Sequence, residues 1–405
     1  MAIDITAVRA EFPSLQAGSA HFDGPGGTQT PRAVIDAVAG ALAAPLSNRG
    51  RATVGERNSD DIVLAARQAM SDLVGVDPAS VVFGRSATQL AYDFSRTLSS
   101  TWSADDEVVV TRLDHDSNVR PWVQAAARVG ATVRWAQFDP ASGELTPDDV
   151  AAVLSDRTRV VAVTAASNLI GTRPDVAAIA QLAHDVGALV YVDGVHAAAH
   201  NFIDVAALGA DVFTCSPYKF LGPHLGTLAA RPELLETLHP DKLLPATDVV
   251  PERFEFGTLP YEMLAGVRAA VDFLAGLDPG CGETRRTRLE SSFESLEDHE
   301  DALRVEIENG LRSLPGVVVH SRARRRTPTL LVTFEQHSTA DAARLLAARG
   351  VDAPSGSFYA LEASRHLGLG DTGGLRIGLA PYSDQRDVER LLVGLAEFLD
   401  SPGRD

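Results

Sequence analysis

The chain has 405 residues, of which 45% are hydrophobic and 22% are charged, a composition typical of globular proteins. Its formal net charge of -18 argues against nucleic acid or an anionic membrane as a main partner. Its start has no signal-peptide pattern, and no stretch reaches the roughly 18 apolar residues of a membrane span, so we expect a cytoplasmic protein.

Between residues 60 and 230, apolar runs alternate with segments of helical spacing. The predicted strands are, in chain order, 81–83, 108–110, 131–133, 160–164, 189–192, 212–214 and 226–228. The predicted helices among them are 61–73, 90–98, 119–129 and 176–186. This alternation indicates an α/β domain with a mostly parallel sheet that helices cover on both faces. In such sheets, functional residues collect at the carboxyl ends of the strands.

The pattern changes after about residue 261. A long charged segment, 284–314, predicts a helix that crosses between two domains. The elements predicted beyond it are strand 329–334, helix 340–349, strand 375–379 and helix 384–399. We therefore expect a large domain over residues 21–260, and an interdomain helix and small α+β domain over residues 261–405. Residues 1–20 are expected to pack with the small domain.

Two further features carry weaker signals. The two cysteines, Cys215 and Cys281, are too few for a disulfide framework or a zinc site, so no metal centre is expected, and Cys215 lies in an apolar run. The basic cluster at residues 322–326 predicts a solvated loop, although it could instead bind an anionic group.

Lysine is rare in this chain: Lys and Arg together number 36, yet only Lys219 and Lys242 are lysines. A lysine amine can lose its proton and condense with a carbonyl, which a guanidinium cannot do. Lys219 follows the predicted strand 212–214, and Asp193 comes directly after the predicted strand 189–192. A lysine and a carboxylate at strand ends suit pyridoxal phosphate, with Lys219 on its aldehyde and Asp193 on its pyridine nitrogen. The alternative is a capping aspartate and an unrelated surface lysine.

A candidate phosphate site lies at residues 84–89, which follow one predicted strand and open a helix. The backbone N–H groups of Ala87 and Thr88, and the Thr88 hydroxyl, are the donors that a phosphate prefers. An ordinary helix cap would have the same sequence.

Other polar residues stand near the same strand ends. His115 could stack on the cofactor ring, although a lone loop histidine is also typical of a surface. His196 lies one turn after Asp193 and could bond the cofactor's phenolic oxygen. Ser216 and Tyr218 could reach the phosphate.

Taken together, these motifs resemble those of the class V aminotransferase and cysteine desulfurase family of fold-type I pyridoxal phosphate enzymes. The similar segments are residues 21–28 (HFDGPGGT), 113–122 (LDHDSNVRPW), 216–224 (SPYKFLGPH) and 375–378 (LRIG). The resemblance covers nearly the whole chain. Within the family, the chain is similar above all to the cysteine desulfurase-like branch.

The resemblance implies a role for each matching cofactor residue. Lys219 would be the Schiff-base lysine, Asp193 the pyridinium partner and His115 the stacking residue. Asn168 would contact both the ring and the substrate. The implied phosphate ligands are Thr88, Ser216 and Tyr218.

Two further roles are implied by the resemblance. Gly257 and Thr258 match a segment that reaches the phosphate of a second subunit, which implies a homodimer. Arg376 matches the arginine that binds the substrate α-carboxylate, a task suited to its bidentate fork.

The chain departs from the desulfurase pattern at one loop. Desulfurases carry a cysteine there that takes sulfur from the substrate, but residues 350–359 (GVDAPSGSFY) contain no cysteine. Tyr359 stands near the cysteine position and is a candidate substrate contact, and Pro354 replaces a usual arginine. Neither Cys215 nor Cys281 is suitably placed.

The sequence therefore predicts an enzyme that acts on an amino acid or cysteine conjugate, with C–S bond cleavage by β-elimination first among its possible reactions. Transamination, racemisation and decarboxylation with oxidative deamination stay open. A non-catalytic protein that only binds pyridoxal phosphate is the rival from another class.

Overall fold

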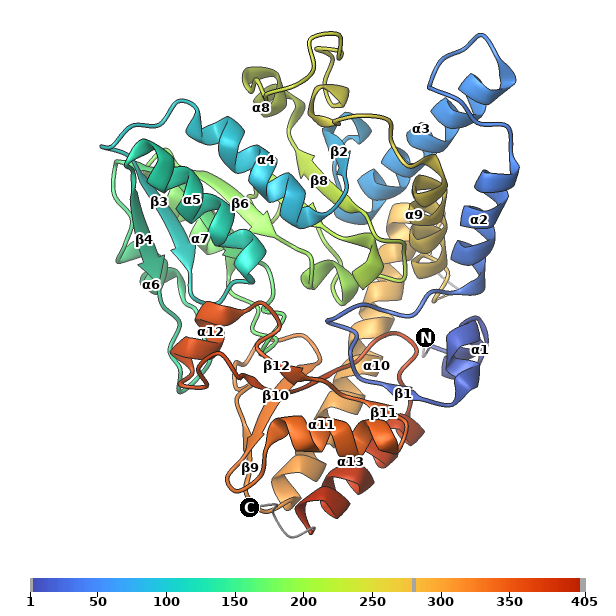
Figure 1. Ribbon diagram of the computed structural model, residues 1–405, viewed down its shortest axis with the longest axis vertical. Coiled ribbons are helices and arrows are strands. Elements are labelled where there is room, and N and C mark those ends of the chain that lie inside the picture. Colours follow the sequence, from blue (N-terminus) through green and yellow to red (C-terminus); the bar gives the residue numbers. More distant parts are fainter. Residues whose placement is uncertain (1–2, 279–281, 401–405) are drawn as a thin grey trace.

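A seven-stranded sheet forms the centre of the larger part of the molecule. The structure is a computed structural model that describes residues 3–278 and 282–400 (Figure 1). The strands are β2 (Val81–Gly84), β3 (Glu107–Thr111), β4 (Thr132–Ala136), β5 (Thr158–Thr164), β6 (Leu189–Asp193), β7 (Val212–Cys215) and β8 (Gly226–Ala230). They lie in the order β2-β8-β7-β6-β5-β3-β4, and only β8 is antiparallel to its neighbours. The predicted mostly parallel sheet is confirmed.

Helices cover both faces of this sheet (Figure 1). The helices of this part of the molecule are α2 (Arg32–Ala43), α3 (Val54–Val74), α4 (Ala87–Ser99), α5 (Arg120–Val129), α6 (Pro147–Ala151), α7 (Val176–Asp185), α8 (Pro232–Thr237) and α9 (Tyr261–Leu274), of which α3, α4, α5 and α7 contact the strands. Side chains alternate across a strand, so Val109 of β3 packs into one core, whereas Val108 and Val110 pack into the opposite one. Because the strands are buried on both faces, nearly every position in them is apolar, which explains the near-continuous apolar runs in the sequence.

The smaller part is an antiparallel sheet with helices against it. Its strands are β9 (Val317–Val319), β10 (Thr329–Phe334), β12 (Ser355–Gly356) and β13 (Gly374–Gly378), in the order β12-β13-β10-β9. Its helices are α11 (Thr339–Ala348), α12 (Leu361–His366) and α13 (Gln385–Leu399). No helix of the described residues is both long enough and apolar enough to cross a membrane.

The N-terminal segment joins both parts of the molecule. Strand β1 (Ala20–His21) pairs in parallel with β11 (Val351–Asp352). Arg9 of α1 (Ile5–Ala10) donates to the Asp387 carboxylate of α13 at 2.6 Å. The ring of Phe12 contacts Tyr382, and it also contacts Phe273 of α9 at 5.6 Å between centroids.

Helix α10 (Arg285–Ser313) connects the two parts (Figure 1). Its early apolar residues, such as Leu296, pack in the core of the large sheet, and later ones, such as Ile307, pack in the core of the small sheet. Helix α9 packs with the large sheet through Leu264 and Val267. This packing argues for a division inside α10 rather than at residue 261, because α9 has its apolar partners in the large domain.

Leu296→Ala should lower the free energy of unfolding by about 2–5 kcal/mol, because the Leu296 side chain is fully buried and its removal leaves a cavity in the core. The matched control on the same helix is Val305→Ala, whose side chain is 45% exposed and whose loss should change stability by about 0.5 kcal/mol or less. Urea denaturation of both variants measures the difference. Equal effects would contradict the assignment of Leu296 to the core.

Candidate active site

A cavity of about 320 Å³ lies at the carboxyl ends of the large sheet, next to strand β13 of the small one. We call it the main cavity. The structure brings every predicted site residue to its wall except Gly257 and Thr258, which lie on an exposed segment of this chain. The predicted residues that line it are Ala87, Thr88, His115, Asn168, Asp193, His196, Ser216, Tyr218, Lys219, Tyr359 and Arg376.

Lys219 ends a short 3-10 turn, Pro217–Lys219, that follows strand β7. Its Nζ donates to the carbonyl of Pro25 and lies 4.6 Å from the centre of the Tyr218 ring. Burial, and then the positive charge of Arg376, lower the pKa of Lys219 to about 7, against the opposing effect of Asp23 and Asp193. A large share of these amines is therefore neutral, and able to attack a carbonyl, near neutral pH.

Asp193 is a buried carboxylate at the end of β6. Its Oδ1 accepts the backbone N–H of Val195 at 2.8 Å, and burial raises its pKa to about 6. The Oδ2 atom accepts no hydrogen bond from the described residues. A buried carboxylate with one such oxygen fits a protonated pyridine nitrogen, which would supply the missing donor.

His115 follows β3 and carries a neutral ring. Its Nδ1 accepts the backbone N–H of Ser117 at 3.1 Å and lies 2.7 Å from the Ser117 hydroxyl. This contact leaves the proton on Nε2. Burial, assisted by Lys219 and Arg376, lowers the pKa of His115 to about 4, so an uncharged aromatic ring is available for stacking.

The start of α4 has the donors that a phosphate requires. Ser86 caps the helix, because its Oγ accepts the N–H of Gln89 at 3.1 Å, and the N–H groups of Ala87 and Thr88 have no partner within the helix. A Cβ at Gly226 of β8 would lie only 2.2 Å from the backbone of Ser86, so this approach requires glycine.

Arg376 of β13 is 2% exposed and has three partners around its guanidinium. Its Nη2 pairs with Asp23 at 2.6 Å, and its Nη1 donates to the Asn168 carbonyl at 3.1 Å. Its Cζ lies 3.7 Å from the centre of the Phe358 ring. Its Nε has no hydrogen-bond partner among the described residues, and neither has Oδ1 of Asn168. Buried polar atoms without partners are rare, so both are suited to a bound amino acid or cofactor.

The loop before α12 closes one side of the main cavity. Asn168 Nδ2 donates to the Phe358 carbonyl at 3.0 Å, and the N–H of Asp116 donates to the Tyr359 carbonyl at 2.7 Å. Phe358 and Tyr359 have φ angles of 52° and 56°, which cost about 1–3 kcal/mol each in residues other than glycine. The Tyr359 side chain is 78% exposed, at the rim.

His196 lines the main cavity, but one of its ring nitrogens already has partners in the protein. Its Nε2 lies 2.9 Å from the Thr327 hydroxyl and 3.0 Å from the Thr329 hydroxyl, both from the small domain. Only Nδ1 is left for another partner.

Two residues that sequence reasoning missed are Asp23 and Phe358, both of which contact Arg376. The glycines that follow Asp23 in segment 21–28 were a usable signal, and the structure gives their reason: a Cβ at Gly26 would lie 2.2 Å from the Asp23 carboxylate. Phe358 had no such signal, because its position depends on the fold of its loop.

The thiol of Cys215 is buried in the core of the large sheet, outside the walls of the main cavity, and burial raises its pKa. A thiol held in its protonated form in a core is a poor nucleophile. Cys281 lies outside the described residues.

Comparisons with known proteins agree with this geometry. The family model for aminotransferase class-V matches residues 20–391. The uncharacterized protein MT3887 of Mycobacterium tuberculosis is 36% identical, over 98% of this chain and 100% of its own. A probable cysteine desulfurase of Pseudomonas aeruginosa is 29% identical, over 97% and 98%. The crystal structure of the cysteine desulfurase CsdA of Escherichia coli superposes with a TM-score of 0.87 at 26% identity, covering 99% of both chains.

In protein freed of cofactor, Lys219 should react with cyanate with a midpoint near pH 7, because its pKa is lowered to about 7. Mass spectrometry of the Lys219 peptide across a pH series measures the midpoint. Arg376→Gln should move it to higher pH, since the positive charge of Arg376 contributes to the lowering. A midpoint near the ordinary lysine value of about 10.4 would contradict the described environment.

Proposed function

The chain belongs to the aminotransferase class-V family and is a pyridoxal phosphate-dependent enzyme of its cysteine desulfurase-like branch, and on this premise we propose that it cleaves the C–S bond of S-substituted cysteines by β-elimination. When bound, pyridoxal phosphate supplies an electron sink for the bonds at the substrate's α-carbon. Because members of this branch are enzymes, we reject the hypothesis of a non-catalytic protein that only binds pyridoxal phosphate.

One observation carries the choice of reaction: the loop beside the main cavity has no thiol. The cysteine desulfurases that the chain resembles use a cysteine there as sulfur acceptor, and residues 350–359 offer Tyr359 at the cavity rim instead. Cys215 cannot substitute, since its thiol is buried in the core. Elimination needs no acceptor on the protein, because the sulfur leaves on its own substituent.

We assign the roles of this chain's residues as follows. Arg376 holds the substrate carboxylate through its Nε atom, and Oδ1 of Asn168 accepts a hydrogen bond from a donor of the bound molecule; neither atom has another partner among the described residues. Asp193 holds the proton on the ring nitrogen, and His115 stacks as a neutral ring. The phosphate donors are Ala87, Thr88, Ser216 and Tyr218.

Lys219 moves the proton in this scheme. Its Nζ, with a pKa lowered to about 7, takes the proton from the α-carbon, and the thiolate then leaves from the β-carbon. In sum, an S-substituted cysteine and water yield pyruvate, ammonia and a thiol. Transamination, racemisation and oxidative deamination use the same residues at first and differ in their products.

The loop also supports a substrate larger than cysteine. Ser355, Gly356 and Ser357 are small, and the position usually held by an arginine is Pro354. Of this loop only Phe358 and Tyr359 line the main cavity, so the proposal of a larger substrate rests on the loss of a charged side chain at residue 354.

A cytoplasmic homodimer is part of the same proposal. In the dimer, Gly257 and Thr258 would reach the phosphate of the partner. The segment that carries them exposes apolar side chains that a second copy would cover: Phe256 is 44% exposed, Val249 65% and Leu244 97%.

Borohydride reduction of the enzyme should fix the cofactor to Lys219, so Lys219→Ala should retain none of the covalently bound cofactor. Lys242→Ala is the matched control, because Lys242 pairs with Asp248 at the surface and does not line the main cavity. Peptide mapping reads the result. Labelling at Lys242 would overturn the assignment.

The substrate test compares products. S-Ethylcysteine and S-benzylcysteine should yield equimolar pyruvate and thiol, whereas free cysteine should release sulfide at least about tenfold more slowly. Cys215→Ser should leave the lyase rate within about twofold if the protein folds, because the thiol lies outside the cavity. Efficient sulfide release that Cys215→Ser or Cys281→Ser abolishes would restore the desulfurase reading, and transfer of the amino group without pyruvate would favour an aminotransferase.

A further inference from the structure

A second cavity of about 190 Å³ lies beside the main one. Its walls come from the start of α7, the segment after β6 and the loop that carries Arg325. Most of the lining is apolar, with Phe202, Ile203 and Leu208 among it, and the polar groups include Arg173, Arg325 and Asn201. Its volume is far larger than the roughly 10–15 Å³ that one water requires.

Two guanidinium groups meet at this cavity with little compensation. Arg173 has one ion pair, to Glu297 at 3.6 Å, which is long for a charge-assisted contact. Burial lowers the pKa of Arg173 against the opposing charges of Glu297 and Asp301, and the charge of Arg325 adds to the lowering. The side chain of Arg325 makes no hydrogen bond or ion pair within the described part of the chain, although the protein has 54 acidic residues. This arrangement favours an anion.

Asp204 also lines the second cavity but does not neutralise these arginines. Its Oδ1 accepts the N–H of Ala207 at 2.9 Å, and its Oδ2 lies 3.5 Å from Arg286. The carboxylate is therefore engaged elsewhere.

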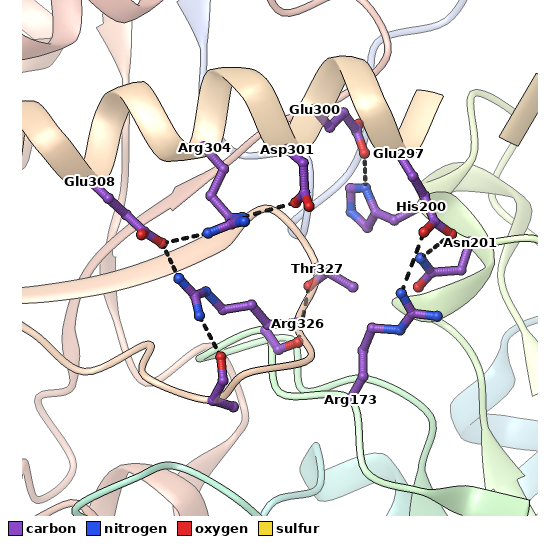
Figure 2. A network of polar contacts seen from close by, with 12 residues as sticks. Arg173, His200, Asn201, Glu297, Glu300, Asp301, Arg304, Glu308, Arg326 and Thr327 are labelled. Carbon is purple, nitrogen blue, oxygen red and sulfur yellow. Dashed lines mark hydrogen bonds and ion pairs between the residues drawn. The ribbon is translucent and has the colours of Figure 1, made fainter. Parts of the chain in front are cut away.

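The third group is the amide of Asn201, which is 4% exposed. Its Nδ2 donates to Glu297 at 2.7 Å, next to Arg173 (Figure 2). Because an ionised carboxylate only accepts hydrogen bonds, this contact fixes which end of the amide is oxygen. Oδ1 is then buried and has no partner among the described residues, so it is an acceptor that lacks a donor.

We propose that the second cavity is an accessory binding site for a small organic acid that carries a hydrogen-bond donor beside its carboxylate, as 2-hydroxy acids and 2-amino acids do. The carboxylate accepts from Arg173 and Arg325. The hydroxyl or ammonium group donates to Oδ1 of Asn201, and a short hydrocarbon part lies against Phe202 and Leu208. No chemistry at Lys219 is required.

The two cavities share a thin wall. Ala165 and Ala197 line the second cavity, and their chain neighbours Ala166 and His196 line the main one. Since the main cavity also has an arginine that suits carboxylates, an experiment must separate the two sites.

The test titrates the holoenzyme with 2-hydroxybutanoate in a calorimeter and follows the cofactor absorbance in parallel. We expect two sites per chain, of which only one changes the absorbance. Arg325→Gln and Arg173→Gln should weaken the silent site by about tenfold or more, because each removes a charged hydrogen-bond donor. Arg322→Gln is the matched control on the same loop, outside the cavity, and should change neither site.

Two further ligands define the chemistry. Butanoate, which lacks the donor, should bind the silent site more weakly than 2-hydroxybutanoate, and Asn201→Ala should abolish that preference. Inorganic phosphate should bind less well than the hydroxy acid.

Three outcomes would overturn the proposal: a single site that changes the absorbance, a silent site that survives Arg325→Gln, or phosphate binding as tight as that of the hydroxy acid. Arg325 is exposed, so its variant decides the matter even if Arg173→Gln fails to fold. Failure of the lyase assay leaves this titration unaffected.

Discussion

Balance among buried charges is the constraint on which the main cavity depends. Lys219 and Arg376 bring positive charge into a cleft from which much of the water is excluded, and Asp193 and Asp23 bring negative charge. A buried charge without a partner destabilises the fold far more than a paired one, so each carboxylate must lie close to a positive group. The N-terminal segment supplies Asp23 for this purpose, and its pairing with β11 and the bridge from Asp23 to Gly378 hold it beside Arg376.

The large sheet was predictable because its strands are buried on both faces. Runs such as Val160–Thr164 therefore appear in the sequence as segments made mostly of β-branched residues, and β5 contains the whole of this run. Strands β9 and β12 were missed, because two or three residues are too few to show the alternation of apolar and polar residues that marks a strand. Their extended shape comes from pairing with β10 and β13. Helices α2 and α9 were missed as well, because α2 packs on α9 and α9 packs on α3, outside the alternating strand–helix pattern.

Much of the main cavity could also be read from the sequence, since residues that directly follow parallel strands meet at one edge. Asp193, His115 and Lys219 follow this rule. His196 also follows this rule, but the contacts of its Nε2 with Thr327 and Thr329 could not be predicted, because these residues lie more than 130 positions away in the sequence. Asp23 and Phe358 reach the site from outside the large sheet, and only the folded chain brings them there.

Helix α10 limits how the two domains can move. At about 1.5 Å per residue, its 29 residues form a continuous rod of roughly 43 Å. Because its first half is part of one core and its second half part of the other, neither domain can slide along or pull away from this helix without exposing buried side chains. Glu362 of α12 adds a second tie between the domains, because its carboxylate pairs with Arg112 at 2.7 Å and with Arg120 at 2.5 Å. The width of the cleft is therefore set both by the packing along α10 and by these ion pairs.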